Sequence, residues 1–397
     1  MKNKNLTFKN NIKNKIFKGR SLKILSKKFD KKFSEVKKEI KDNNKTLNVL
    51  DKKFRLNFKT KDLNKFKRFK TISIIGMGGS ILGAEALYDF FQEKIKKKVY
   101  FFDDLNETKI TDLKKKEDLS KILFVIISKS GNTVETLSNL FALQIIKKRS
   151  KNLILISENK NNLLFSLSKK QSLFYVEHKP HIGGRYSILS EAGILPAFLM
   201  GINIIKLRLK ILECLKKKNE KFLKESCIKL ASLINSKKYN NLIFLNYAPS
   251  LEKFLYWCQQ LIAESLGKKG KGFMPVISNS PKDHHSLLQL YLDGPKDKLF
   301  HFFSLDKKSK EIINFDKNLK IKSFLNKKKL STVKNAQKMA LIKSLQKKKI
   351  PYRVFKIRKL DEETLGQLFS YFIIETVIVG KMLNLNPFDQ PAVEQVK

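Results

Sequence analysis

The feature that most constrains this chain is a series of short apolar segments that begins at residue 71 and alternates with amphipathic stretches. The strand candidates are short and rich in Ile, Leu, Val and Phe, and they lie at 71–76, 98–103, 121–128, 151–157 and 172–178. Helical spacing separates them, notably at 81–93 and 133–148. Continuous apolar strands are buried on both faces, which requires helices on either side of a parallel sheet. The pattern therefore predicts a doubly wound α/β unit.

A second, weaker series of the same kind follows a long helical region at 187–236. Its strand candidates lie at 240–247, 298–305 and 352–357, and an apolar-faced helix is expected at 361–383. Residues 1–65 are rich in lysine with sparse helical periodicity, which is typical of helices packed outside a core. We therefore divide the chain into an N-terminal helical segment at 1–65, a first α/β domain at 66–205, a second at 206–360 and a C-terminal helical segment at 361–397.

The net charge of +47 raises the question of a polyanionic partner. The basic residues are nearly all lysines, spread along the whole chain, and no basic helix or aromatic RNA-binding motif accompanies them. A bias toward lysine at solvated positions explains this distribution, so we expect no nucleic-acid partner. The field of so many lysines should still concentrate small anions near the protein.

The cysteines and the apolar runs indicate in which cellular compartment the protein is expected. Cys214, Cys227 and Cys258 are odd in number and lack C-x-x-C spacing, so we expect reduced core residues and no zinc site. The N-terminal segment has lysines but no continuous apolar stretch, which argues against a signal peptide. No apolar run approaches the roughly 18 residues that a membrane span needs. We expect a cytoplasmic protein without a membrane partner.

Two glycine- and hydroxyl-rich turns follow predicted strands. In GMGGSILG at 76–83, Gly79 and Ser80 precede a helix, where glycines let backbone amides approach an anion, although a tight structural turn would look the same. The spacing fits neither the dinucleotide G-x-G-x-x-G nor a Walker loop.

In SKSGNT the polar residues come at the carboxyl end of a strand and the start of a helix, the edge where ligands bind in open parallel sheets. They are Ser128, Lys129, Ser130 and Thr133. Hydroxyls and amides there suit a monophosphate without a metal, and ordinary helix capping by Ser130 or Thr133 is the alternative.

Three further segments carry residues suited to catalysis. Arg185 follows paired glycines in GGRYS. Glu264 lies near the end of an amphipathic helix that Gly267 could close, where the helix dipole disfavours the carboxylate and suits a proton-transfer base. A solvated helix-end glutamate is the alternative. His284 and His285 precede a helix that places His285 and Gln289 on one face, and no pair of histidines at metal-ligand spacing occurs.

Taken together and in chain order, six segments resemble the glucose-6-phosphate isomerase family of the sugar-isomerase (SIS) superfamily. They are GMGGSILG, SKSGNTVET, GGRYSILSEAG, AESLGK, HHSLLQ and FDQPAVEQVK, and the resemblance covers about residues 70–397. It implies two SIS-type doubly wound parallel-sheet domains, each an αβα sandwich, with the C-terminal helical segment completing the active site. It also implies a homodimer in which the neighbouring subunit supplies the catalytic histidine, His285, and it requires no cofactor and no metal.

The resemblance assigns roles for the interconversion of glucose 6-phosphate and fructose 6-phosphate. Glu264 would move the proton between C1 and C2, and Arg185 would face the developing oxyanion. His285 and Lys397 would open the sugar ring. The substrate-binding residues would be Gly79, Ser80, Ser128, Lys129, Ser130, Thr133 and Gln390.

Two other functions remain open at this point. The Gly131-Asn132 pair is common in the wider superfamily, which keeps a dual glucose/mannose-phosphate isomerase possible. A non-catalytic regulator that binds sugar phosphates is the alternative of another class, although such a protein has no need for Glu264, His285 and Lys397 together.

Overall fold

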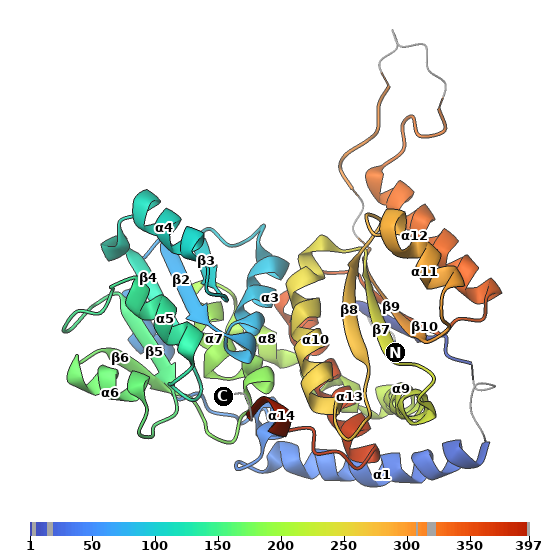
Figure 1. Cartoon of the computed structure of the whole chain (residues 1–397), viewed down its shortest axis with the longest axis horizontal. Helices are drawn as coiled ribbons and strands as arrows, with labels where there is room; N and C mark the ends of the chain where they lie inside the picture. Colours follow the sequence, from blue (N-terminus) through green and yellow to red (C-terminus); the bar gives the residue numbers. More distant parts are fainter. Residues whose placement is uncertain (2–4, 14–18, 307–308, 316–322, 395–397) are drawn as a thin grey trace.

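The computed structural model describes residues 1, 5–13, 19–306, 309–315 and 323–394, which form two α/β halves lying side by side (Figure 1). In the first half, a five-stranded parallel sheet has the order β3-β2-β4-β5-β6. Its strands are β2 (Thr71–Gly76), β3 (Lys98–Phe102), β4 (Ile122–Ile127), β5 (Leu153–Ser157) and β6 (Phe174–Glu177). All five match the predicted strands, so the doubly wound expectation is confirmed for this half.

Alternate residues of the first sheet's central strand pack against different layers of helices. On β4, Phe124 and Ile126 face a cluster that contains side chains of α4 (Glu107–Lys116), α5 (Val134–Ala142) and α6 (Leu163–Lys170). Leu123 and Val125 face the large core shared with α3 (Leu82–Phe91) and α7 (Glu191–Leu199). Both faces are covered because successive side chains of a strand point to opposite sides.

The second sheet has the order β1-β10-β9-β7-β8. Its strands are β7 (Asn241–Asn246), β8 (Met274–Asn279), β9 (Lys298–Leu305), β10 (Tyr352–Ile357) and β1 (Leu6–Asn10). The first four are parallel, and β1 runs antiparallel to β10 at one edge.

Two strands of this sheet were missed in the sequence. The helical segment predicted at 1–65 contains α1 but also a strand, β1, in which Leu6 and Phe8 are buried in the core. The pattern that would reveal it is only five residues long and interrupted by lysine. Strand β8 contains Pro275, which argues against a central strand, and the strand indeed lies at the edge opposite β1.

Helices surround and join the two sheets. The remaining ones are α1 (Gly19–Lys41), α2 (Thr60–Leu63), α8 (Ile204–Leu209), α9 (Lys217–Ser236), α10 (Glu252–Leu266), α11 (His284–Asp293), α12 (Leu330–Lys347), α13 (Glu362–Met382) and α14 (Pro391–Glu394). The long helical region predicted at 187–236 is therefore divided into the α-helices α7, α8 and α9. The helix predicted at 133–148 is α5, which ends at Ala142. The N-terminal α1 runs along α9 and α13 of the second half (Figure 1).

Helix α13 is the central helix of the molecule. Among the described residues it alone is long and apolar enough to cross a membrane, but 94% of its apolar stretch is buried inside the fold. Its side chains join those of α8, α9 and α10 in one large core that extends into both halves. Burial in this core explains its apolar composition. The three cysteines are free and buried, as predicted.

Candidate active site

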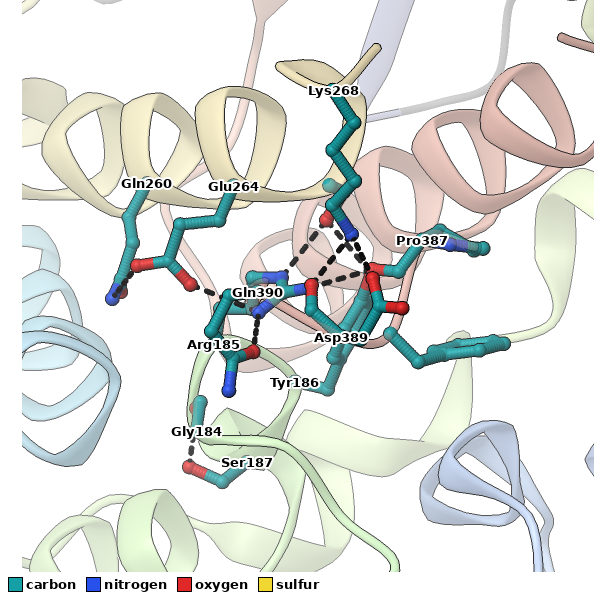
Figure 2. A network of polar contacts seen from close by, with 12 residues as sticks. Gly184, Arg185, Tyr186, Ser187, Gln260, Glu264, Lys268, Pro387, Asp389 and Gln390 are labelled. Carbon is teal, nitrogen blue, oxygen red and sulfur yellow. Dashed lines mark hydrogen bonds and ion pairs between the residues drawn. The ribbon is translucent and has the colours of Figure 1, made fainter. Parts of the chain in front are cut away.

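Arg185 lies at the centre of a polar network between the two halves (Figure 2). It belongs to a short 3-10 turn, Gly184–Leu189, and only 2% of its surface is exposed. Its Nη1 donates to Oε2 of Glu264 at 2.9 Å and to Oε1 of Gln390 at 2.8 Å, while its Nε donates to Oγ of Ser265 at 2.9 Å. Three residues predicted from separate motifs therefore meet at one guanidinium group.

The same turn fixes the C-terminal segment in place. Arg185 Nη2 donates to the carbonyl oxygens of Pro387 and Asp389 at 2.7 and 2.9 Å. Tyr186 donates its hydroxyl to the Pro387 carbonyl, and Lys268 pairs with the Asp389 carboxylate. Partial burial alone would raise the pKa of Asp389, but the hydrogen bond and charge of Lys268 hold it below the usual value. Gln390 thus reaches the site on an anchored segment.

Glu264 lies in the last turn of α10, which Gly267 ends as predicted. Its side chain keeps 27% exposure, so a ligand can reach the carboxylate beside the buried arginine. The other carboxylate oxygen, Oε1, accepts a hydrogen bond of 2.9 Å from Nε2 of Gln260. The sequence analysis missed Gln260, although its position one helical turn before Glu264 on the same face was the available signal.

The first glycine loop packs directly on the arginine turn. A Cβ atom at Gly79 would lie 2.5 Å from the backbone nitrogen of Arg185, closer than real Cβ atoms approach. Ser187 donates its hydroxyl to the Gly79 carbonyl at 3.3 Å. Ser80 ends the short turn Gly78–Ser80 and is partly exposed beside this contact. The glycine at 79 is therefore required for loop packing, which adds a structural role to the ligand contact expected from the sequence.

The second loop follows β4 at the point where the strand order of the first sheet reverses, between β2 and β4. Ser128 and Thr133 share a hydrogen bond of 2.8 Å between their hydroxyls, and Ser130 lies 3.4 Å from the Thr133 hydroxyl. Thr133 precedes α5, yet its side chain makes no capping bond to the helix. Simple N-capping by Thr133 therefore does not account for this group of hydroxyls.

Lys129 extends from the same loop toward the segment before the arginine turn. Its Nζ donates to the Pro180 carbonyl at 2.8 Å and lies 3.5 Å from Oε1 of Glu158. Burial lowers the pKa of Lys129, the Glu158 carboxylate opposes this, and the charge of Arg185 lowers it further. The charge of the arginine turn therefore reaches Lys129 in the second loop. Glu158 was not predicted, because only the fold brings it to Lys129.

The Gly131-Asn132 pair has a structural explanation. Gly131 has a φ of +70°, which favours glycine, and a Cβ atom there would overlap the side chain of Asn162. Asn132 accepts a hydrogen bond of 2.9 Å from the Leu163 backbone at the start of α6. The pair thus joins the second loop to α6, whichever sugar phosphate is bound.

His285 and Lys397 are not brought to Arg185 by the described residues. His285 is exposed in the first turn of α11, and no hydrogen bond or ion pair links it to Arg185 or Glu264 in the part of the chain described. Its neighbour His284 instead shares a hydrogen bond of 2.7 Å with the Tyr247 hydroxyl. Lys397 lies outside the described residues.

The fold and the site together define the class: a two-domain sugar-isomerase (SIS) protein, with an anion-suited loop at the switch point of its first sheet. The family follows from comparison with known proteins. A family profile described as "Phosphoglucose isomerase" matches residues 30–397, and the chain belongs to this family.

Relatives agree with this assignment. The chain is 34% identical over 358 residues to a probable glucose-6-phosphate isomerase of Methanococcus maripaludis, covering 85% of this chain and 79% of that protein. It is 31% identical over 357 residues to a glucose-6-phosphate isomerase of Methanocaldococcus jannaschii, covering 85% of both. A crystal structure of a glucose-6-phosphate isomerase from Chlamydia trachomatis shares the fold with a TM-score of 0.78 and 17% identity, covering 99% of this chain and 87% of that one.

Proposed function

We propose that this chain is a glucose-6-phosphate isomerase, which interconverts D-glucose 6-phosphate and D-fructose 6-phosphate through an enediol(ate) intermediate. Membership of the phosphoglucose isomerase family and the names of its relatives support this activity, which belongs to glycolysis and gluconeogenesis. The observation that carries the proposal is the pairing of a partly exposed carboxylate, Glu264, with a buried arginine, Arg185, at 2.9 Å. A protein that only binds sugar phosphates does not need such a pair.

In this proposal Glu264 transfers the proton. With the open-chain aldose bound, its carboxylate takes the proton from C2, and the electron pair moves to the C1 carbonyl oxygen to give the enediolate. The guanidinium of Arg185 faces the resulting oxyanion and stabilises it electrostatically. The same carboxyl group then returns the proton to C1, while the proton of the C2 hydroxyl passes to the C1 oxygen, so that C2 becomes the ketone and C1 carries a hydroxyl. Gln260, bonded to the second carboxylate oxygen, holds Glu264 in position.

The second loop anchors the phosphate in this proposal. The hydroxyls of Ser128, Ser130 and Thr133 lie at the amino end of α5, where backbone amides and the helix dipole favour an anion. Lys129 is partly buried, and its ion-pair partner Glu158 lies 3.5 Å away. A phosphate dianion would therefore further compensate the positive charge of Lys129. Binding energy from the phosphate then orients the reacting carbons.

In this proposal Gly79, Ser80 and Gln390 line the part of the site that binds the sugar. Gly79 and Ser80 lie on the loop packed against the arginine turn, and Gln390 is bonded to Arg185. These contacts supply backbone and amide groups that can bind sugar hydroxyls. Ring opening is assigned to His285 and Lys397.

We assign His285 to the site of a second copy of the chain, in a cytoplasmic homodimer. Its exposure supports this assignment, as does the lack of any hydrogen bond or ion pair between His285 and Arg185 or Glu264 among the described residues. The histidine then comes from the neighbouring subunit, and the isolated subunit lacks a complete site.

The activity is tested by incubating purified protein with fructose 6-phosphate and measuring glucose 6-phosphate through a coupled dehydrogenase. Steady conversion is expected, and no conversion would favour a binding-only protein. Mannose 6-phosphate measured in parallel tests the dual-specificity alternative, and we expect no comparable turnover.

The dimer is tested by mixing two inactive variants, His285→Ala and Glu264→Gln, under conditions that exchange subunits. If the histidine acts across the interface, each mixed dimer has one intact site, so random exchange restores about one quarter of wild-type activity. If it acts within its own chain, no mixed dimer has an intact site and activity stays absent.

A further inference from the structure

The second sheet repeats the strand order of the first. Strands β8-β7-β9-β10 lie in the order that β3-β2-β4-β5 have in the first sheet. The strand order of the second sheet therefore reverses between β7 and β9. In open parallel sheets, the crevice outside the carboxyl ends of the strands at such a reversal is where ligands bind. The proposed phosphate loop occupies this position in the first sheet. In the second sheet the proposed reaction uses His285, which follows β8 at the same edge, but it assigns no role to the crevice between β7 and β9.

A cavity of about 590 Å³ lies at this position in the second half. Its lining includes Tyr247, which directly follows β7, and Ser304, near the end of β9. The first turns of α12 contribute Ser331, Lys334 and Lys338. The volume is sufficient for a phosphorylated metabolite of small size.

Lys338 is the most informative residue of this cavity. Only 8% of it is exposed, and its Nζ donates to the Ser304 hydroxyl at 3.1 Å. No carboxylate in the described part of the chain forms an ion pair with it. Asp306, whose charge acts on Lys338, is already paired with Lys356 at 2.8 Å. A buried ammonium group whose hydrogen-bond partner is a neutral hydroxyl is costly to desolvate, and a bound anion would offset this cost.

The remaining charges of the lining also favour an anion. Lys310 and Lys334 accompany Lys338, against the carboxylates of Glu93 and Glu311. The amino end of the 18-residue α12 adds its helix dipole, and its N-cap residue makes no side-chain capping bond. Burial also lowers the pKa of Lys338, so a neighbouring anion would restore it toward the usual value.

We propose that this cavity is a second phosphate-binding site, in which Lys338 and Ser304 bind a phosphate group at the carboxyl edge of the second sheet. It is separate from the site at Arg185 and Lys129, and it does not depend on the isomerase activity. The ligand is either inorganic phosphate or the phosphate ester of a small metabolite.

Equilibrium dialysis with labelled inorganic phosphate tests the site, at about 0.15 M salt so that diffuse surface attraction is screened. We expect two phosphates per wild-type chain and one per chain of Lys338→Met, which keeps the aliphatic stem. Lys343→Met is the matched control, because Lys343 lies on the same helix but is exposed, and it should still bind two. Lys338→Met that binds as many phosphates as the wild type, or equal losses in both variants, would overturn the proposal; one phosphate on the wild type and none on Lys338→Met would instead count against the Lys129 site.

A second variant guards against a folding defect in Lys338→Met. Ser304→Ala removes only a hydroxyl, and it should weaken one of the two phosphates by about tenfold; unchanged affinity for both would contradict the proposal. Lys129→Ala should instead remove the other phosphate. If it still binds two while Lys338→Met binds one, the assignment of Lys129 fails and this second site stands. Displacement of the phosphate left in Lys129→Ala by fructose 6-phosphate distinguishes an ester site from a site for the free ion.

Discussion

Replacing Glu264 by glutamine tests the proposed base while keeping the volume of the side chain. The carboxylate accepts hydrogen bonds from Arg185 and Gln260, both at 2.9 Å. A glutamine retains both contacts if its oxygen faces Arg185 and its amide donates to Oε1 of Gln260, which is buried and has no partner among the described residues. For this the side-chain amide of Gln260 must flip, so that its oxygen faces residue 264. Because Arg185 is only 2% exposed, loss of the carboxylate charge should lower the free energy of unfolding by about 1–3 kcal/mol, even with both hydrogen bonds retained.

The expected kinetic effect is much larger. A positioned general base contributes roughly 10²–10⁴-fold, and here one carboxyl group serves both the removal and the return of the proton. We therefore expect kcat to fall by about 10³-fold, equivalent to ~4 kcal/mol of activation free energy. The KM should change by less than about threefold, because phosphate binding lies on a different loop and only transition-state stabilisation is lost.

The assay is conversion of fructose 6-phosphate coupled to glucose-6-phosphate dehydrogenase, with the thermal midpoint measured on the same preparation. Glu264→Asp, which keeps the charge but shortens the side chain, should retain more activity than Glu264→Gln. A kcat within tenfold of wild type for Glu264→Gln would refute the assignment. A large fall in the thermal midpoint would show that the substitution acts on the fold instead.

Three other substitutions test the surrounding structure. Lys129→Ala should raise KM by about tenfold or more with little change in kcat. The control Lys160→Ala removes an exposed lysine that also pairs with Glu158, and it should leave KM unchanged. Equal effects of the two substitutions on KM would exclude a phosphate contact by Lys129. Gly79→Ala should destabilise the fold by about 1–3 kcal/mol and lower kcat/KM, while Gly183→Ala, with only ordinary contacts at 3.4 Å or more, should not. Arg185→Lys keeps the charge but loses the planar fork, so kcat should fall at least about 10²-fold; near-normal turnover would remove the guanidinium from the mechanism.

The strands of the first sheet were predictable because each is an apolar run buried on both faces. Such runs keep their character wherever the chain folds, so local sequence is sufficient. Strand β1 is different: it is a strand only because the edge of β10 is available to pair with it, some 350 residues along the chain. Strand β8 was hidden by Pro275, which an edge position tolerates and a central one does not.

For the site, too, local sequence predicted some features and the tertiary structure decided others. The residue types and their order indicated an arginine, a carboxylate and a hydroxyl-rich anion loop. The partners that position them were not visible, since Glu158 meets Lys129 and Gly79 meets Arg185 only through loop packing. Gln260 was the exception, because helical spacing alone places it beside Glu264.

The sequence by itself determined the alternation of strands and helices, and with it the fold class, because burial periodicity is a local property. It also determined which side chains are available for chemistry. The tertiary structure alone decided where those side chains meet. Arg185 and Gln390 lie 205 positions apart, and they come within 2.8 Å because α10 and α13 pack in one core and the chain after α13 returns to the arginine turn. No local pattern encodes such a contact, since it depends on the packing of elements that are distant in the chain.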